Sequence, residues 1–323
     1  MTKIPIRVGI TMGDPSGIGS YITAKAIERL DGLAEFIVIG DKRVFEKAKG
    51  KKQKAKNYRF VDLKNVAEKN FKFGETRAEY GKASIEYLDQ ALELIKDKEI
   101  DCIVTCPISK EAINLAGYKY SGHTEYFSRK TGAEDFVMML LNSRLKISLV
   151  TRHSPLACVT SELTEEKIYK TILLTCKSLK ELFFLKKPRL VVCGVNPHAS
   201  DNGLIGDEEN NIVKPALKRL AGAADNNGII DGPLSADVAI ARAAQGEYDC
   251  VIAMYHDQAL IPLKLTDDKN GVNITLGLSF IRTSPLHGTA FDIAAAGFRG
   301  AKADSLIAAI KLAVKCVSVQ KNA

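Results

Sequence analysis

The strongest constraint in this sequence is the alternation of short apolar runs with longer segments of helical period. The apolar runs predict β-strands over Arg7–Thr11, Phe36–Ile39, Asp101–Thr105, Phe136–Leu141, Lys146–Val150, Arg189–Val195, Tyr248–Met254 and Val272–Leu276. Apolar residues at helical spacing predict helices over Ser20–Leu30, Ile85–Ile95, Thr164–Leu185 and Ala303–Val317. Alternating strands and helices indicate an α/β fold with a mainly parallel sheet. The short connection between Phe136–Leu141 and Lys146–Val150 predicts an antiparallel hairpin.

Length and composition indicate a globular protein of about two domains. The chain has 323 residues, of which 46% are hydrophobic and 26% are charged. Its apolar runs are too short for a membrane-spanning helix, and its first residues lack the features of a secretory signal. Its seven cysteines include no Cys-x-x-Cys pair and are expected to be buried thiols. We therefore expect a cytoplasmic protein without a membrane partner.

The formal net charge of +8 raises the question of a nucleic-acid partner. Much of this charge lies in the lysine-rich run Lys47–Lys56, which we interpret as a solvated loop or helix end, with a polyanion-binding patch as the alternative. Tryptophan is absent, and no basic stretch alternates with aromatic residues as a base-stacking surface would. We therefore expect no nucleic-acid partner, and a positive bias also suits an enzyme with anionic substrates.

Three of the five histidines follow predicted strands. His153 follows the run that starts at Lys146, His198 follows the run that starts at Arg189, and His256 follows the run that starts at Tyr248. Ligands of open parallel sheets collect at the carboxyl ends of the strands. Three imidazoles at one such edge can bind a zinc or cobalt ion and leave coordination positions open for a substrate. The alternative is that each is an ordinary surface or capping histidine.

Other polar segments favour an anionic ligand. His123 and His287 lie among glycine and small polar residues, as ligand-facing loops often do. Lys264 and Arg282 are expected in loops or at strand ends, with Asn273 between them, and this combination suits a phosphate group. The glycine-rich segment Met12–Gly19 either holds an anion through backbone amides or is only a tight turn.

Taken together, the motifs of this chain resemble the 4-hydroxythreonine-4-phosphate dehydrogenase family of pyridoxal phosphate biosynthesis. The motifs run in family order and are Met12–Gly19, Cys106–Lys110, Ser121–Glu125, Asn196–His198, Asp231–Asp237, Tyr255–Gln258 and Arg282–Asp292. The resemblance implies two α/β/α domains around a cleft, as in isocitrate and isopropylmalate dehydrogenases. Residues 1–125 with 275–323 form the first expected domain and residues 126–274 the second, and the active site lies in the cleft and at the interface of a homodimer.

The resemblance also assigns roles to individual residues, each at a position that matches a family motif. It makes His153, His198 and His256 the ligands of one divalent cation (zinc, magnesium or cobalt), one of them supplied by the partner subunit. It makes His123, Thr124, Lys264, Asn273 and Arg282 substrate-binding residues. It assigns NAD or NADP to His287, Gly288, Ala290 and Asp292. Asp237 and Asp257 are our candidates for orienting a metal histidine or relaying a proton.

The implied reaction is the oxidation of 4-phosphohydroxy-L-threonine to 2-amino-3-oxo-4-phosphooxybutanoate, which decarboxylates to 3-amino-2-oxopropyl phosphate. The chain departs from the usual family pattern at Gly19–Tyr21 and at Ala199–Gly203. These departures keep open a paralogous activity on 4-phospho-D-threonate or erythronate in sugar-acid catabolism. A metal-dependent phosphate-ester hydrolase is a further alternative from another class of enzyme, although no cluster of carboxylates supports a dinuclear site.

Overall fold

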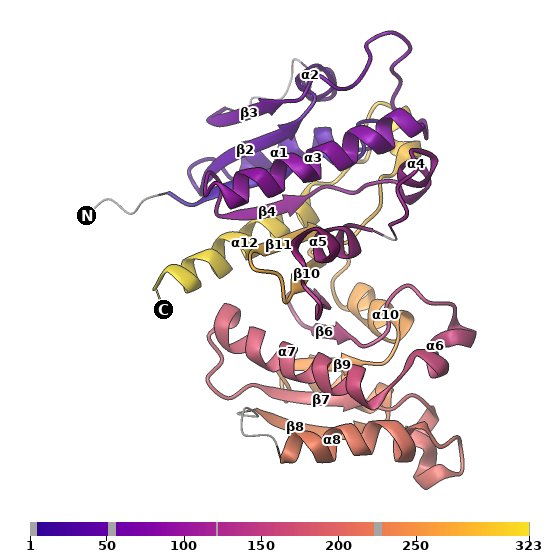
Figure 1. Cartoon of the computed structure of the whole chain (residues 1–323). Coiled ribbons are helices and arrows are strands. Elements are labelled where there is room, and N and C mark those ends of the chain that lie inside the picture. Colours follow the sequence, from indigo (N-terminus) through magenta and orange to yellow (C-terminus); the bar gives the residue numbers. More distant parts are fainter. Residues whose placement is uncertain (1–4, 51–55, 121, 223–227, 323) are drawn as a thin grey trace. The chain divides into compact units, whose positions relative to one another are not determined.

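The protein folds into two compact units, each built around parallel strands. The computed structural model describes residues 5–50, 56–120, 122–222 and 228–322. Unit 1 comprises Met1–Gly132 and Leu278–Ala323, and unit 2 comprises Ala133–Gly277 (Figure 1). The chain therefore leaves unit 1 after residue 132 and returns to it at residue 278. The boundaries expected from the sequence lie after residues 125 and 274.

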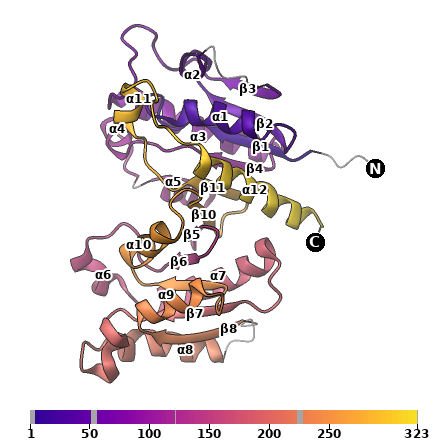
Figure 2. The same cartoon turned by 180° about the vertical axis from the view of Figure 1, so that it is seen from behind.

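Unit 1 contains five parallel strands in the order β3-β2-β1-β4-β11. These strands are β1 (Arg7–Thr11), β2 (Glu35–Gly40), β3 (Tyr58–Asp62), β4 (Cys102–Thr105) and β11 (Ile281–Pro285). The helices are α1 (Gly19–Arg29), α2 (Lys42–Lys49), α3 (Ala78–Lys96), α4 (Lys110–Leu115), α5 (His123–Thr131), α11 (Phe291–Ala295) and α12 (Asp304–Asn322). The two views show α3 on one face of this sheet and α1 and α12 on the other (Figures 1 and 2).

Unit 2 contains six strands in the order β10-β5-β6-β9-β7-β8. These strands are β5 (Val137–Leu141), β6 (Lys146–Leu149), β7 (Arg189–Cys193), β8 (Ile229–Leu234), β9 (Cys250–Ala253) and β10 (Val272–Leu276). Strands β10, β5 and β6 pair antiparallel, whereas β6, β9, β7 and β8 pair parallel. The helical segments are α6 (Leu156–Glu162), α7 (Glu165–Phe183), η1 (Pro197–Gly203), η2 (Glu209–Val213), α8 (Lys214–Ala221), α9 (Ala236–Ala244) and α10 (His256–Thr266).

Local sequence explains where several of these elements begin. Asp41 caps α2 by accepting hydrogen bonds from the backbone amides of Arg43 and Val44. The Thr164 side chain caps α7 by accepting a hydrogen bond from the Lys167 backbone amide. Strand β5 is buried along its whole length, which matches its continuous apolar sequence. The hairpin of β5 and β6 turns at Asn142, whose side chain accepts from the amides of Arg144 and Leu145.

The α/β architecture expected from the sequence is confirmed, as are the predicted strands, the four predicted helices and the hairpin. The sequence analysis missed β3, β8 and β11. Its placement of Lys264 in a loop or at a strand end was wrong, because this residue lies in the last turn of α10. Six of the seven cysteines are buried as expected, and Cys158 is exposed.

The lysine-rich run is partly described. Lys47 and Lys49 lie in the last turns of α2, as the helix-end interpretation expects, whereas residues 51–55 lie outside the described part of the chain. No helix within the described residues combines the length and the apolar composition that crossing a membrane requires.

Candidate functional site

The three predicted metal histidines follow three neighbouring parallel strands of unit 2. Strand β9 pairs with β6 on one side and with β7 on the other. His153 follows β6, His256 is the first residue of α10 directly after β9, and His198 lies in η1 after β7. The parallel register brings all three strand ends to one edge of the sheet, which is where ligands of such sheets bind.

Within this set, the structure brings His153 and His256 together. Their ring centroids are 5.4 Å apart, with the ring planes inclined by 44°. His256 Nδ1 lies 2.6 Å from Asp257 Oδ1, so its Nε2 is the nitrogen available to a cation. A carboxylate that orients an imidazole in this way is common beside metal ligands. The donor chemistry of this pair therefore fits a divalent cation.

His198 does not join this pair within one chain. Over the described residues, no group of three or more histidine, cysteine, aspartate and glutamate side chains is arranged to hold a metal ion. His198 is exposed on η1 and lies near Asp237, the acidic residue in the first turn of α9. A hydrogen bond from the Ser235 hydroxyl, together with the Val238 backbone amide, lowers the pKa of the exposed Asp237, which is therefore ionised at neutral pH.

In unit 1, Arg282 is a buried cation on β11. Its Nη2 donates to the Thr105 hydroxyl on neighbouring β4 at 2.6 Å. Burial lowers the pKa of the Arg282 guanidinium to about 9, and the charge of Glu125 opposes this change. The group therefore keeps its positive charge at neutral pH and can attract an anion inside unit 1.

His123 begins α5 and lies close enough to Arg282 to respond to its charge. Burial and the positive charge of Arg282 hold the pKa of His123 well below its usual range, opposed by a hydrogen bond to the Cys106 backbone. Nε2 of this ring is buried and has no hydrogen-bond partner among the described residues. A neutral imidazole that donates to a carbonyl through one nitrogen presents the other as an acceptor. Thr124, the next residue, is buried beside it.

The remaining predicted substrate residues lie in unit 2. Lys264 is exposed on α10, and Asn273 lies on β10 with a buried Oδ1 that has no partner among the described residues. The predicted substrate set is thus divided between the units: His123, Thr124 and Arg282 lie in unit 1, and Lys264 and Asn273 lie in unit 2.

The predicted cofactor residues form the loop that connects β11 to α11. His287 Nδ1 lies 3.0 Å from the Gly288 carbonyl oxygen, Ala290 adopts a left-handed conformation as the N-cap of α11, and Asp292 lies in the first helical turn. The Thr289 carbonyl accepts a hydrogen bond from the backbone amide of Ile18 at 3.0 Å. This bond fixes the loop against the glycine-rich segment that follows β1.

The glycine-rich segment Met12–Gly19 is a tight turn held by backbone hydrogen bonds within the segment and to Pro107 and Thr289. The amides of Asp14, Gly17 and Ile18 donate to the carbonyls of Pro107, Asp14 and Thr289. The Ser16 amide donates to Asp14 Oδ1. Because these amides already bond within the protein, they are not available to an anion, and the turn interpretation accounts for them.

Asp14 is a residue that the sequence analysis did not single out. It is fully buried, and its Oδ2 has no hydrogen-bond partner among the described residues. Burial raises the pKa of Asp14 to about 7, and the hydrogen bond from the Ser16 amide opposes this shift. The sequence signal was available, because Asp14 lies between two glycines of a turn after a strand, but its burial is a tertiary property.

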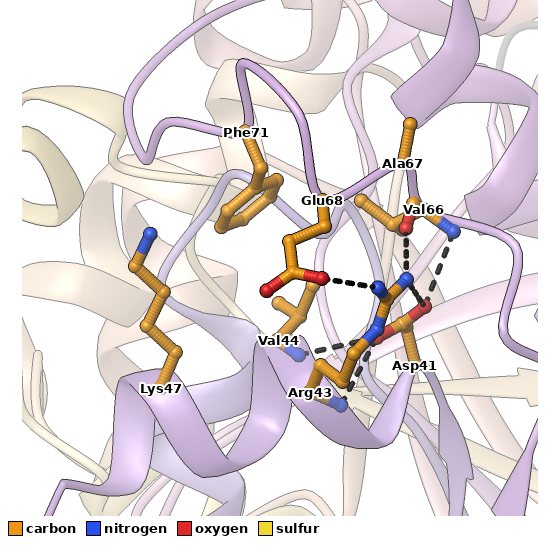
Figure 3. Close-up of a pocket in the computed structure, with 8 residues that line it drawn as sticks. All are labelled: Asp41, Arg43, Val44, Lys47, Val66, Ala67, Glu68 and Phe71. Atoms are coloured by element: carbon orange, nitrogen blue, oxygen red, sulfur yellow. Dashed lines mark hydrogen bonds and ion pairs between the residues drawn. The ribbon is translucent and has the colours of Figure 1, made fainter.

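A small pocket of about 210 Å³ lies at the carboxyl ends of β2 and β3 (Figure 3). Arg43 is bonded there to Glu68 at 3.2 Å, and Lys47 lies over the Phe71 ring at 5.2 Å. Its ionisable lining consists of Asp41, Arg43, Lys47 and Glu68. Two positive and two negative groups leave this pocket without a net charge that would attract a phosphate.

A family model described as pyridoxal phosphate biosynthetic protein PdxA matches residues 24–313. The chain is 42% identical to the 4-hydroxythreonine-4-phosphate dehydrogenase of Sulfurihydrogenibium sp. (strain YO3AOP1), over 98% of this chain and 100% of that protein. It is 39% identical to the D-threonate 4-phosphate dehydrogenase of Salmonella typhimurium, over 95% and 98% of the two chains. The crystal structure of 4-hydroxythreonine-4-phosphate dehydrogenase from Klebsiella pneumoniae superposes with a TM-score of 0.84 at 34% identity, covering 97% of this chain and 99% of that one.

Proposed function

Because this chain belongs to the PdxA family of pyridoxal phosphate biosynthetic proteins, we propose that it oxidises 4-phosphohydroxy-L-threonine with a nicotinamide cofactor and a divalent cation. The family match confirms the family that the motifs indicate, and with it a dehydrogenase. The observation that carries the proposal is the pair of imidazoles, His153 and His256, with ring centroids 5.4 Å apart at the ends of parallel β6 and β9.

We assign the cation to His153, His198 and His256. Imidazole nitrogen favours zinc or cobalt, whereas magnesium prefers oxygen ligands. When bound, the cation supplies Lewis-acid polarisation of the substrate hydroxyl, which lowers the pKa of that alcohol. Asp257 holds the His256 ring through Nδ1, and the ionised Asp237 lies near His198, so each carboxylate can orient one of these imidazoles or accept its proton.

We assign the substrate to residues of both units. Arg282 would supply a charge that is positive at neutral pH for the phosphate, and the exposed Lys264 would add a second one. His123 offers the acceptor nitrogen Nε2, and Asn273 offers the carbonyl oxygen Oδ1, so both suit a donor group of the substrate. Contacts of this kind would orient the substrate for loss of hydrogen from its alcohol carbon.

We assign the nicotinamide cofactor, NAD or NADP, to the loop of His287, Gly288, Ala290 and Asp292. A nicotinamide bound there would supply the acceptor for the hydride of the alcohol carbon, and the hydroxyl proton would leave to a base or to water. The alcohol becomes a ketone, and the resulting β-keto acid loses carbon dioxide to give 3-amino-2-oxopropyl phosphate. Asp292 lies in the first turn of α11, and we propose that its carboxylate accepts from a ribose hydroxyl, which would favour NAD over NADP.

We also propose that the working form is a homodimer with shared active sites. Large apolar side chains are exposed on the segments that carry the predicted site residues: Leu204 and Leu265 are each 83% exposed, and Leu156 is 73% exposed. Exposed groups of this size favour contact with a second chain. A second copy would also supply the third imidazole, since within the described part of one chain no set of three ligands meets.

A second candidate substrate is 4-phospho-D-threonate or erythronate. The identities to relatives with the two names are close, at 42% and 39%. The departure from the family pattern at Ala199–Gly203 lies directly after His198, where it can change the shape of the pocket. A phosphate-ester hydrolase is disfavoured, because the similar proteins named above are dehydrogenases.

The test measures NAD and NADP reduction by absorbance at saturating 4-phosphohydroxy-L-threonine, 4-phospho-D-threonate and 4-phosphoerythronate. The expected result is reduction of NAD with the first substrate, loss of activity with a chelator, and recovery with added zinc or cobalt. Reduction with only the second or third substrate supports the alternative activity. Release of phosphate without reduction of either cofactor contradicts a dehydrogenase.

His153→Ala and His256→Ala test the cation assignment in the same assay. Each is expected to abolish turnover while the melting temperature in the absence of cation stays near that of the wild type. Lys177→Gln, at an exposed side chain on α7, which carries none of the proposed site residues, is the matched control and is expected to retain activity. Full activity of a metal-depleted His153→Ala or His256→Ala preparation contradicts the assignment.

A further inference from the structure

Strands β7 and β9 are tied together, at the ends that carry His198 and His256, by one buried amide side chain. Gln258 lies two residues after His256 in the first turn of α10. Its Oε1 accepts from the Met254 backbone amide at 2.7 Å, and its Nε2 donates to the Gly194 carbonyl at 2.9 Å. Both groups of the side chain are therefore used to hold the end of β7 against the start of the helix that bears His256.

A buried carboxylate holds the next residues along the chain. Glu209 is fully buried in η2, and its Oε1 accepts from the backbone amides of Val195 at 2.7 Å and Asn196 at 2.8 Å. Its Oε2 accepts from Asn196 Nδ2 at 2.9 Å, and the same nitrogen donates to Glu208 at 2.7 Å. The backbone that leads into His198 is thus held by Gln258 at Gly194 and by Glu209 at Val195 and Asn196.

The segment fixed in this way is strained. His198, Ala199, Ser200, Asp201 and Asn202 form a run with positive φ between 46° and 67°. Left-handed backbone is unfavourable for side chains with a Cβ, and such residues persist only where their surroundings hold them. Gly194 makes room for this turn, because a Cβ on that residue would lie 2.8 Å from Ala199 Cα and 2.9 Å from Glu209 Oε1.

We infer that Gln258, Glu209 and Asn196, together called the β7–β9 bridge, are positioning residues for the cation-binding histidines. They fix the positions of the strained turn that carries His198 and of the helix that carries His256. This role is the same if the cation is bound within one chain or across two copies. The inference rests on the proposed function, because it concerns the geometry of the same ligands. None of the three side chains is itself assigned to the cation.

The test uses Gln258→Glu and Glu209→Gln, which exchange one polar atom each. Gln258→Glu keeps the acceptor for Met254 but loses the donor to Gly194. Glu209→Gln replaces one of the two accepting oxygens by an NH2 group, which cannot accept a hydrogen bond from Val195 or Asn196. Thr175→Val is the matched control, because it removes a buried hydrogen bond to Ser148 in the same unit and leaves the bridge intact. Purified metal-free protein is titrated with Co²⁺ by calorimetry, and the visible spectrum of the loaded protein, the melting temperature, kcat and KM are recorded.

The expected result is a roughly 10–100-fold weaker Co²⁺ affinity for both bridge variants, with an altered Co²⁺ spectrum and a lower kcat. Thr175→Val is expected to lower the melting temperature and to keep the wild-type affinity and spectrum. Wild-type affinity and spectrum in both bridge variants overturn the inference. A wild-type protein that binds no Co²⁺ and reduces NAD in the presence of chelator overturns the proposed function instead.

A second measurement does not depend on the variants folding. In the cation-free wild type, the backbone amides of Val195 and Asn196 are expected to exchange with deuterium as slowly as those of β7, because Glu209 accepts from both. Fast exchange of these two amides in the folded protein overturns the inference.

Discussion

At the scale of single residues, the most informative groups are those that burial has shifted away from their usual protonation. His123 is neutral because it is buried and lies near the charge of Arg282. Asp14 binds a proton more tightly than an exposed aspartate because no solvent and little hydrogen bonding stabilise its charge. Both shifts change how folding stability responds to pH, and their signs are opposite.

Asp14→Asn is expected to stabilise the protein at alkaline pH. A folded-state pKa of about 7 against an ordinary value of 3.8 means that the native state holds the proton longer than the unfolded chain. Wild-type stability therefore falls as the pH rises from about 4 to about 7, by up to about 4 kcal/mol. Because asparagine does not titrate, the stability of the variant does not decrease in this pH range.

The measurement is the melting temperature of both proteins from pH 4 to pH 8. The advantage of the variant is expected to grow with pH. Asp41→Asn is the control, because Asp41 is buried too but accepts from three backbone amides, so its replacement is expected to destabilise at pH 8. An Asp14→Asn difference that is independent of pH would show that Asp14 keeps an ordinary pKa.

His123→Asn is expected to reduce acid sensitivity. The folded-state pKa of His123 lies below its unfolded value, so below about pH 6.5 the unfolded chain takes up a proton that the native state refuses. Stability is complete above that pH and decreases as the pH falls. The difference in melting temperature between variant and wild type, measured at pH 8 and again at pH 5, should therefore move in favour of the variant at pH 5. A constant difference contradicts a neutral buried imidazole.

At the scale of elements, close packing of helices depends on small residues at defined places. Gly81 lies near the start of α3, where a Cβ would come within 2.1 Å of the Ala112 carbonyl oxygen on α4. The backbone of α4 therefore approaches α3 more closely than any larger side chain permits.

Gly81→Ala is expected to destabilise unit 1, although alanine favours a helix more than glycine does. The clash with the backbone exceeds the gain of about 1 kcal/mol in helix propensity, for a net loss on the order of 1–3 kcal/mol. Urea unfolding monitored by circular dichroism measures it. Gly222→Ala at the end of α8, where the nearest atom is 3.7 Å away, is the control and should be neutral within about 0.5 kcal/mol.

The strands that sequence reasoning missed share a physical cause. Strands β3 and β8 are at the edges of their units and carry exposed or half-buried residues, so they lack a continuous apolar run. Strand β11 is fully buried, but its sequence is Ile-Arg-Thr-Ser-Pro. Two of its polar residues donate hydrogen bonds to other elements: Arg282 to the Thr105 hydroxyl and Thr283 to the Ala309 carbonyl. No local pattern contains that information.

At the scale of the whole molecule, mixing two inactive variants tests whether the active site is shared. If His153 and His256 of one chain meet His198 of another, a hybrid of His153→Ala and His198→Ala subunits contains one complete site. After subunit exchange, about half of the dimers are hybrids and each has one of two sites, so about a quarter of wild-type activity should return.

The assay refolds or incubates the two variants together and compares them with each variant alone. Sedimentation equilibrium establishes that dimers form, and Leu204→Asp with Leu265→Asp, at exposed apolar positions, is expected to reduce both dimer content and activity. Dimers that exchange subunits and recover no activity would place His153 and His198 of a site in the same chain.

The sequence by itself determined the class of fold, the order of the main strands and helices, the family, and the candidate residues that we propose for the site. It did so because apolar periodicity and family motifs are local properties of the chain, and three histidines after three strands can be read without coordinates. Only the tertiary structure decided which strands are neighbours, that His153 and His256 meet while His198 stays on a strained turn, and that Asp14, Arg282 and the Nε2 atom of His123 are buried. These properties depend on contacts between residues far apart in the sequence. The buried groups lose their contact with water only when those contacts have formed.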